Sequence, residues 1–134
     1  MNRLRFMQAC LIGLLALLIS SCTISPETQA KMDEYARTIP TCTSDQDCQE
    51  KWNAARTWVM ENSDFAIRAE SDTRIFSTTT SISQSGVGVI VDRVAVAGGG
   101  YQITVNVECF SAYGCPDVWA KKIDFNKTVN AAQL

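Results

Sequence analysis

The most distinctive chemistry in this chain belongs to its six cysteines, because the sequence contains no histidine. Histidine is the most common general base and metal ligand, so neither a Ser-His-Asp nor a Cys-His catalytic arrangement can form. Carboxylates remain, but no pair of them lies in a recognisable catalytic context. We therefore expect a protein that is not an enzyme and that uses no metal or cofactor. The six cysteines are Cys10, Cys22, Cys42, Cys48, Cys109 and Cys115.

Four of these cysteines form two equally spaced pairs, since five residues separate Cys42 from Cys48 and five separate Cys109 from Cys115. Four cysteines in an exported domain are typical of two disulfides, and three connectivities are possible. The turn signals around each pair favour the local pairing, Cys42 with Cys48 and Cys109 with Cys115. The competing pairing joins Cys48 to Cys109, because both occupy positions predicted to face the core. A zinc site is a further alternative, although the spacing is not that of CxxC ligands.

The N-terminal 21 residues show the three parts of a secretory signal peptide. Arg3 and Arg5 give a basic start, an apolar stretch follows up to Ile19, and a pair of serines supplies small residues at its end. The strongly apolar part is much shorter than the roughly 20 residues that a membrane-spanning helix needs. We therefore expect residues 1–21 to be a signal that is removed.

The end of this signal, Ile19-Ser20-Ser21-Cys22, resembles the lipobox of bacterial lipoproteins. The resemblance implies that the thiol of Cys22 carries a diacylglyceryl group, that a peptidase cuts before it, and that the new amino group is acylated as well. Several acyl chains anchor a protein stably, whereas one chain binds reversibly. By the sorting rule of Gram-negative lipoproteins, Thr23 in place of Asp favours the outer membrane and its periplasmic face, with cell-surface display as the other possibility. The alternative is an ordinary signal peptide with an incidental cysteine.

The balance of charges does not support nucleic-acid binding. The chain has 12 basic and 14 acidic side chains, and two of the basic ones, Arg3 and Arg5, lie in the signal. Nucleic-acid-binding proteins need clustered cations to displace counterions from phosphate, and this chain has no run of Lys or Arg. We therefore expect its partners to be the membrane, through the lipid, and an envelope protein rather than a nucleic acid.

The remaining residues suit one small domain behind a tether. Residues 22–41 form a polar stretch, which we interpret as a lipidated tether that could reach about 60–70 Å if fully extended. Part of this stretch also fits a short helix, because Ser25 is a plausible N-cap and Pro26 suits the first helical position. Residues 42–134 then form the disulfide-stapled domain.

The main helix is predicted to begin after Ser44 and to end at the turn-forming residues 62–64. Ser44 as N-cap, with Asp47 three residues later, resembles a capping box, and Asp45 and Asp47 lie at the positive end of the helix dipole. Trp58 lies about 80° from the centre of the apolar face, so we interpret it as a flank of the core or, alternatively, as a partner contact. The apolar face itself consists of Cys48, Trp52, Ala55 and Val59.

The middle of the chain predicts the start of an antiparallel meander sheet. Alternating residues predict a first strand over 65–70, and a turn at Ser71 and Asp72 leads into a second strand over 73–79. Seven of the nine residues over 77–85 are Ser or Thr, which is typical of a solvated edge or a loop. We assign no site to this run.

Two longer strands follow. The first, over 86–97, is rich in valine and changes its apolar phase near Asp92, which predicts a bulge or a strand covered on both faces. Three glycines over 98–100 then predict a hairpin turn. The second strand, over 101–109, alternates apolar and polar residues, so we expect one dry and one wet face.

The C-terminal part predicts a loop and a short helix. Pairing of Cys109 with Cys115 would close a loop with Tyr113 near its tip, and Trp119 follows shortly after. An exposed aromatic pair of this kind suits partner contact, with core packing as the alternative for Trp119. Helical spacing predicts a closing helix over 124–134. The fold class is therefore α+β, with one main N-terminal helix on a roughly four-stranded antiparallel meander sheet and a short C-terminal helix.

The chain contains five further short motifs: Cys42-x5-Cys48, Trp52-x5-Trp58, Ser71-Asp72, Gly114-Cys115 and Phe125-Asn126. Together these motifs resemble those of small Gram-negative lipoproteins, a resemblance that implies a compartment and no mechanism. We expect an outer-membrane-anchored lipoprotein that acts as a non-enzymatic binding or assembly module of the envelope. The alternative is an inhibitor of a lysozyme-like hydrolase, because periplasmic lysozyme inhibitors are small, disulfide-bonded and β-rich, and Ser85-Gly86 resembles part of their loop motif.

Overall fold

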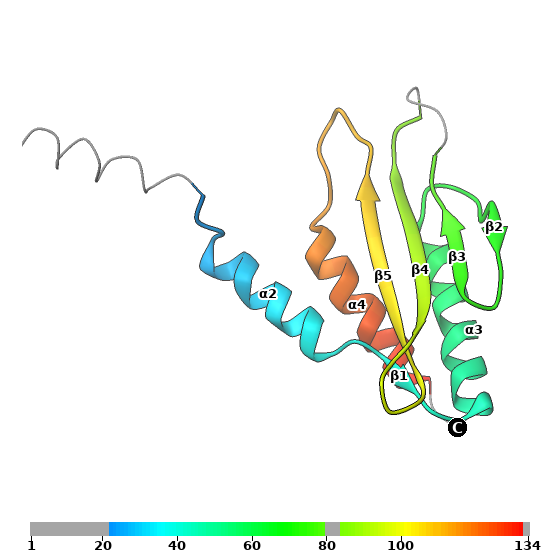
Figure 1. Ribbon diagram of the computed structural model, residues 1–134. Coiled ribbons are helices and arrows are strands. Elements are labelled where there is room, and N and C mark those ends of the chain that lie inside the picture. The colour runs from blue at the N-terminus through cyan, green and yellow to red at the C-terminus, as the bar shows by residue number, and fades with distance from the viewer. Residues whose placement is uncertain (1–21, 80–83, 133–134) are drawn as a thin grey trace, which may run out of the picture.

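A computed structural model gives the structure of residues 22–79 and 84–132. Within these ranges the fold is α+β, with three helices and one five-stranded antiparallel sheet. Helices α3 and α4 lie behind the sheet, and α2 runs beside α4 with its first residues pointing away from the sheet (Figure 1). The elements are α2 (Pro26–Arg37), β1 (Thr41–Cys42), α3 (Asp45–Asn62), β2 (Ala69–Glu70), β3 (Arg74–Ser77), β4 (Val87–Ala95), β5 (Tyr101–Cys109) and α4 (Val118–Ala131).

The sheet has the strand order β1-β5-β4-β3-β2. From β2 to β5 this order follows the chain, as the predicted meander requires, and each pair is antiparallel. The fifth strand, β1, was not predicted. It lies at the far edge, where Thr41 is paired with Gln102 of β5. A strand of two residues has too few positions to show alternation, so only its partner on β5 defines it.

Helix α3 begins where the sequence predicts. The hydroxyl of Ser44 accepts a hydrogen bond from the amide of Asp47 at 3.2 Å, and the helix ends at Asn62 with Ser63 as C-cap. The capping box is only half formed, because the carboxylate of Asp47 pairs with Lys51 at 3.1 Å. All four predicted core positions of α3 are buried, and they are Cys48, Trp52, Ala55 and Val59.

The core lies between the sheet and the two helices behind it. Alternate residues of β4 and β5 point toward α3 and α4, as the period of a strand requires. On α4 the largest contribution comes from Phe125, which is fully buried. The inward residues of the two long strands include Val87, Val89, Val91, Ile103, Val105 and Val107.

The predicted strand over 65–70 is mostly wrong, because only Ala69 and Glu70 form β2. The second strand is also shorter than predicted and covers Arg74–Ser77. The beginning of the Ser/Thr-rich run is not solvated: Ser77 is fully buried, lies 2.6 Å from the hydroxyl of Ser63 and donates to the carbonyl of Phe65. Residues 80–83 of that run lie outside the described residues.

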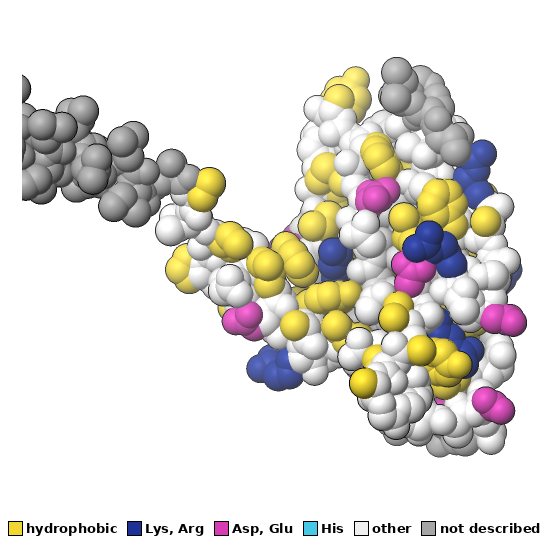
Figure 2. All heavy atoms as spheres, viewed as in Figure 1, with side chains coloured by type: hydrophobic (Ala, Val, Ile, Leu, Met, Phe, Trp, Pro, Cys, Tyr) yellow, Lys and Arg dark blue, Asp and Glu magenta, His cyan; other side chains and the backbone are white. Residues whose placement is uncertain are grey.

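Both predictions for β4 are wrong, because the strand has no bulge and is not covered on both faces, with Val94 of the second apolar phase 48% exposed. The pairing of β4 with β5 is continuous from Val87 opposite Cys109 to Ala95 opposite Tyr101. The second apolar phase belongs instead to the uncovered face of the sheet, where Ile90 lies opposite Phe76 of β3. Figure 2 shows this face, on which yellow apolar side chains are mixed with charged ones.

The hairpin predicted at the three glycines is confirmed. Gly98, Gly99 and Gly100 have φ values of +90°, +99° and +82°, a region that residues with a Cβ atom rarely occupy. Gly100 also lies against β1, since a Cβ atom there would be 2.6 Å from the carbonyl oxygen of Cys42. This turn therefore both reverses the chain and makes room for the fifth strand.

The C-terminal helix is longer than predicted. It starts at Val118 rather than near residue 124, because Asp117 acts as its N-cap and accepts a hydrogen bond from the amide of Ala120 at 3.0 Å. Trp119 consequently belongs to the first turn of α4 and not to a preceding loop.

Candidate functional site

The cysteines divide into one free and four paired residues within the described part of the chain. Cys22 is free and exposed. The disulfides join Cys42 to Cys48 and Cys109 to Cys115, which confirms the predicted local pairing and rules out the competing one. The stapled domain therefore has two short loops fixed by covalent bonds.

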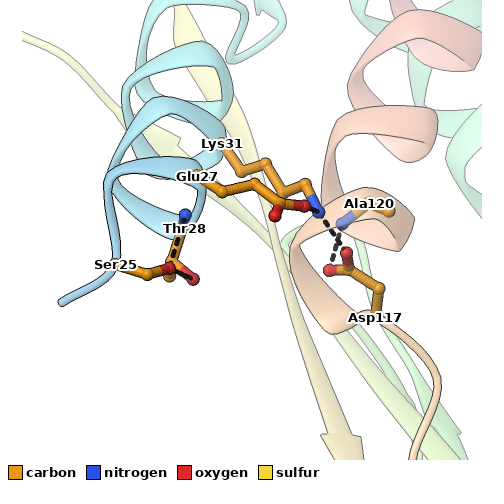
Figure 3. Close-up of polar contacts among 6 residues, drawn as sticks. All are labelled: Ser25, Glu27, Thr28, Lys31, Asp117 and Ala120. Carbon is orange, nitrogen blue, oxygen red and sulfur yellow. Dashed lines mark hydrogen bonds and ion pairs between the residues drawn. The ribbon is translucent and has the colours of Figure 1, made fainter.

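The helix that was an alternative for the predicted tether is present. Ser25 is the N-cap of α2 and accepts a hydrogen bond from the amide of Thr28 at 3.2 Å, and Pro26 occupies the first position of the helix (Figure 3). The 12 residues of α2 span about 18 Å at the usual rise per residue. Between Cys22 and this helix lie only Thr23, Ile24 and Ser25.

A charged latch holds α2 to the start of α4, and we define it as Glu27, Lys31 and Asp117. The ammonium of Lys31 lies 2.5 Å from a carboxylate oxygen of Asp117 and 2.9 Å from one of Glu27 (Figure 3). The hydrogen bond to Asp117 is the main cause that raises the pKa of Lys31 to about 12. The same bond holds the pKa of Asp117 below its usual value. Both pKa shifts favour the charged pair.

Below the latch, uncharged contacts complete the docking of α2. The hydroxyl of Tyr35 donates to the carbonyl of Val105 at 3.2 Å, and burial raises the pKa of this phenol. The fully buried amide of Asn126 on α4 donates to the carbonyl of Tyr35 at 3.0 Å and to the hydroxyl of Thr38 at 3.1 Å. Helix α2 is therefore packed on the stapled domain, and residues 26–37 are not an extended tether.

Trp119, one of the three predicted contact residues, is half-buried between α2 and α4. Its ring lies edge-on to that of Tyr35, with 5.9 Å between the ring centres. The ammonium of Lys122 lies 4.6 Å from the centre of the indole, and burial lowers the pKa of this lysine. Trp119 therefore packs between the two helices. This agrees with the alternative interpretation of Trp119 as a packing residue.

Trp58, the second predicted contact residue, lies in the core. It is 2% exposed, its ring is edge-on to Phe125 at 5.3 Å, and its indole N–H donates to Asp124 at 2.8 Å. The structure thus places Trp58 at the flank of the core and away from a free surface. The sequence could not separate the two interpretations, because the neighbouring α4 defines which side of α3 is covered.

Tyr113, the third predicted contact residue, is 98% exposed on the loop closed by Cys109 and Cys115. In the same loop Phe110 is 40% exposed, although its ring also lies edge-on to Phe65 at 6.5 Å. Among the described residues, the exposed aromatic side chains are these two, and both lie in this loop. The three predicted contact residues are therefore not brought together.

A cleft of about 650 Å³ lies between the first half of α3 and the turn from β2 to β3. Its Arg93 and Tyr101 were not identified from the sequence. Arg93 points to the same inward side of β4 as Val87, Val89 and Val91. A charged residue at a position expected to face the apolar core was therefore the sequence signal that could have identified Arg93. The lining includes Asp45, Trp52, Asn53, Asp72, Arg93 and Tyr101.

Neither the family models nor the curated proteins nor the solved structures include a match to this chain. Over residues 22–79 and 84–132, no helix has the length and apolar character needed to cross a bilayer. In the same ranges no three His, Cys, Asp or Glu residues gather as a potential metal site.

Proposed function

We propose that the chain is a lipoprotein anchored through Cys22 to the outer membrane, facing the periplasm, and that its domain is a non-enzymatic binding or assembly module of the envelope. The supporting observation is the division of the described cysteines. Disulfides form in oxidising compartments, so the two disulfides support export. The free and exposed thiol belongs to Cys22, the last residue of the segment that resembles a lipobox.

Docking of α2 determines how such an anchor would hold the domain. Because only Thr23, Ile24 and Ser25 separate Cys22 from α2, an acylated Cys22 lies next to a helix about 18 Å long. The latch fixes this helix on α4, and the contacts of Tyr35 fix it on both β5 and α4. The domain is then held close to the bilayer on a rigid arm, instead of at the end of a flexible tether.

The proposed contact surface of the module is the loop between Cys109 and Cys115. The disulfide restricts the conformations of the loop before it binds, which reduces the conformational entropy lost on binding. Exposed Tyr113 and Phe110 are of the aromatic type that often dominates binding energy. The same rigid aromatic loop favours a second candidate function, inhibition of a lysozyme-like hydrolase by insertion of the loop into the active-site cleft.

The anchor is tested by substitution and lipid labelling in a Gram-negative cell. Cys22→Ser should abolish incorporation of labelled palmitate and release the protein from the membrane fraction. The matched control is Cys10→Ser, which makes the same exchange inside the signal and should leave labelling intact. Membrane retention of the Cys22→Ser protein would contradict the proposal.

The membrane of residence is tested at the next position. Thr23→Asp should shift the lipoprotein from the outer to the inner membrane in a sucrose density gradient, while Thr23→Ser should leave it in the outer membrane. An unchanged distribution of the Thr23→Asp protein would argue against the outer-membrane assignment.

The contact surface is tested by photo-cross-linking in vivo. A photoreactive amino acid at Tyr113 should give one dominant cross-linked partner, whereas the same amino acid at Met60, an exposed position of α3, should not. A lysozyme assay distinguishes the second candidate. Inhibition by the wild-type protein that Tyr113→Ala weakens would favour an inhibitor over an assembly module.

A further inference from the structure

We propose that the disulfide between Cys109 and Cys115 is a site of thiol–disulfide exchange with a dithiol protein, and that its opening releases the loop that carries Tyr113. The inference rests on the proposed function in one point, the role of this loop as the contact surface. The exchange itself depends on how the disulfide is placed in the fold. Opening of the disulfide then regulates binding by the loop.

The two disulfides differ in burial but not in loop length. Each joins cysteines six positions apart, so the entropy of loop closure does not make either of them harder to open. Cys42 and Cys48 are 1% and 2% exposed. In the other pair, Cys115 is exposed and Cys109 is half-buried. Exchange requires that a thiolate reach a sulfur atom, so the fold protects the first pair and leaves the second accessible.

The protected pair is held in regular structure. Cys42 belongs to β1 and is paired with Tyr101 of β5. Cys48 lies in the first turn of α3, where its amide donates to the carbonyl of Ser44 at 2.9 Å. A thiolate reaches these two sulfur atoms only if β1 or the start of α3 comes apart.

The surroundings of Cys115 are open. Residues 112–117 are all exposed. Tyr113 is 98% exposed, and a Cβ atom on Gly114 would meet nothing within 4 Å. A protein thiol can therefore approach Cys115 while the domain stays folded.

The disulfide is also what ties the tip of the loop to the domain. The loop is fixed at its two ends, by the ring of Phe110 against that of Phe65 and by Asp117 as the N-cap of α4. Among the described residues, no hydrogen bond joins residues 111–116 to the rest of the domain, since the amide of Tyr113 donates to a hydroxyl within the loop. Opening the disulfide therefore leaves the loop attached at its ends alone.

The exchange balances in two steps. A thiolate of the dithiol attacks Sγ of Cys115, the more exposed residue of the pair, so that a mixed disulfide forms and Cys109 leaves as a thiolate. The second thiolate of the dithiol then attacks its own protein's sulfur in the mixed disulfide, and Cys115 leaves as a thiolate. Two electrons pass from the dithiol, which becomes a disulfide, to the cysteine pair. The reverse reaction closes the loop again.

The test uses the full chain, purified with its lipid and incubated with dithiothreitol or, separately, with reduced thioredoxin as a protein dithiol. Free thiols are then alkylated and the protein is digested with trypsin. The peptide over 94–121 should become alkylated at Cys109 and Cys115, while the peptide over 38–51 should keep its disulfide. Trypsin separates the two pairs in this way because it cleaves after Arg37, Lys51, Arg93 and Lys121.

Two outcomes of this experiment overturn the proposal. One is alkylation of both peptides at the same rate, because burial would then give no protection. The other is opening by dithiothreitol but not by reduced thioredoxin, because the site would then be closed to a protein dithiol.

Release of the loop is measured by NMR relaxation on the same samples. After opening, the amides of residues 111–116 should move on the picosecond-to-nanosecond timescale, while the amides of β4 and β5 stay rigid. A loop that remains as rigid as before would also overturn the proposal.

A pair of variants separates this inference from the proposed function. Photo-cross-linking from position 113 should fall several-fold in Cys109→Ser/Cys115→Ser and stay unchanged in Ser111→Ala, which alters the same loop but keeps the disulfide. Equal cross-linking in the wild type and in the double variant would overturn the regulation and leave the contact surface in place. Absence of a cross-link in the wild type would contradict the contact surface, whereas alkylation and NMR relaxation would still decide the exchange.

Discussion

Lys31 of α2 and Asp117, the N-cap of α4, form an ion pair of 2.5 Å across 86 positions of the chain. Asp117 uses both carboxylate oxygens: one accepts from the amide of Ala120 at the start of α4, and the other from the ammonium of Lys31. One carboxylate therefore both starts α4 and holds α2 against it. Docking of α2 is coupled to the integrity of the first turn of α4.

Removal of the latch should loosen α2 without unfolding the domain. In Lys31→Gln the amides of α2 should exchange with deuterium several-fold faster, because an isolated helix of this length is barely stable in water. The amides of β4 and β5 should keep their protection. Lys127→Gln is the matched control, since Lys127 pairs with Glu34 between the same two helices at the longer distance of 3.6 Å. Equal acceleration in both variants would show that Lys31 has no special role.

Docking of α2 should depend on pH at both extremes. The pKa of Asp117 is lowered from its usual 3.8, so its contribution is present above that value and is lost as the pH falls through the lower folded pKa. The pKa of Lys31 is raised from 10.5 to about 12, so its contribution is complete below 10.5 and is lost as the pH rises through 12. The indole signal of Trp119, which contacts Tyr35, should report both transitions. At alkaline pH the contribution of Lys31 is the difference between wild type and Lys31→Gln, because Tyr35 and Lys122 titrate beside the same indole. An acid transition of the same size in Lys31→Gln would refute the assignment to the latch.

The hydrogen bond from Trp58 to Asp124 should contribute to stability. Asp124→Ala leaves the indole N–H of a buried tryptophan without a partner, which should lower the free energy of unfolding by about 1–3 kcal/mol. Asp124→Asn retains an oxygen acceptor and should lose less. Urea unfolding followed by circular dichroism measures both variants. An equal loss in the two would mean that the charge of Asp124, not the hydrogen bond, is what matters.

The two end glycines of the hairpin turn should differ in their tolerance of alanine. Both have positive φ, which costs a residue with a Cβ atom about 1–2 kcal/mol. A Cβ atom at Gly98 meets nothing within 4 Å, whereas one at Gly100 would lie 2.6 Å from the carbonyl oxygen of Cys42. Gly100→Ala should therefore lower the melting temperature more than Gly98→Ala. Identical melting temperatures would show that β1 moves aside freely.

The parts of the fold that could be predicted are those in which one element buries one face. Ser44 caps α3 and the stripe from Cys48 to Val59 is buried, because the helix packs on a single side. The strand over 101–109 was predicted correctly for the same reason. Disulfide pairing was also predictable, since short spacing and turn signals agreed.

The remaining parts depend on contacts between distant segments. The inward orientation of Trp58 requires α4, and β1 exists only through its pairing with β5. At the candidate sites, lipidation of Cys22 and partner contact by Tyr113 stay predictions, to which the structure adds their exposure. The cleft at Arg93 could not be predicted, because its walls come from three separate segments of the chain.

The edge position of β1 determines the order in which the chain can assemble. Thr41 is paired with Gln102 of β5, Tyr35 donates to β5, and Lys31 pairs with the N-cap of α4. The positions of α2 and β1 therefore depend on the C-terminal elements β5 and α4. Such pairings across long sequence separations are slow steps in folding. A chain delivered N-terminus first can close the Cys42–Cys48 disulfide early, since it spans six positions. Helix α2 and the edge strand β1, however, cannot pair with β5 and α4 before the C-terminal third of the chain has emerged.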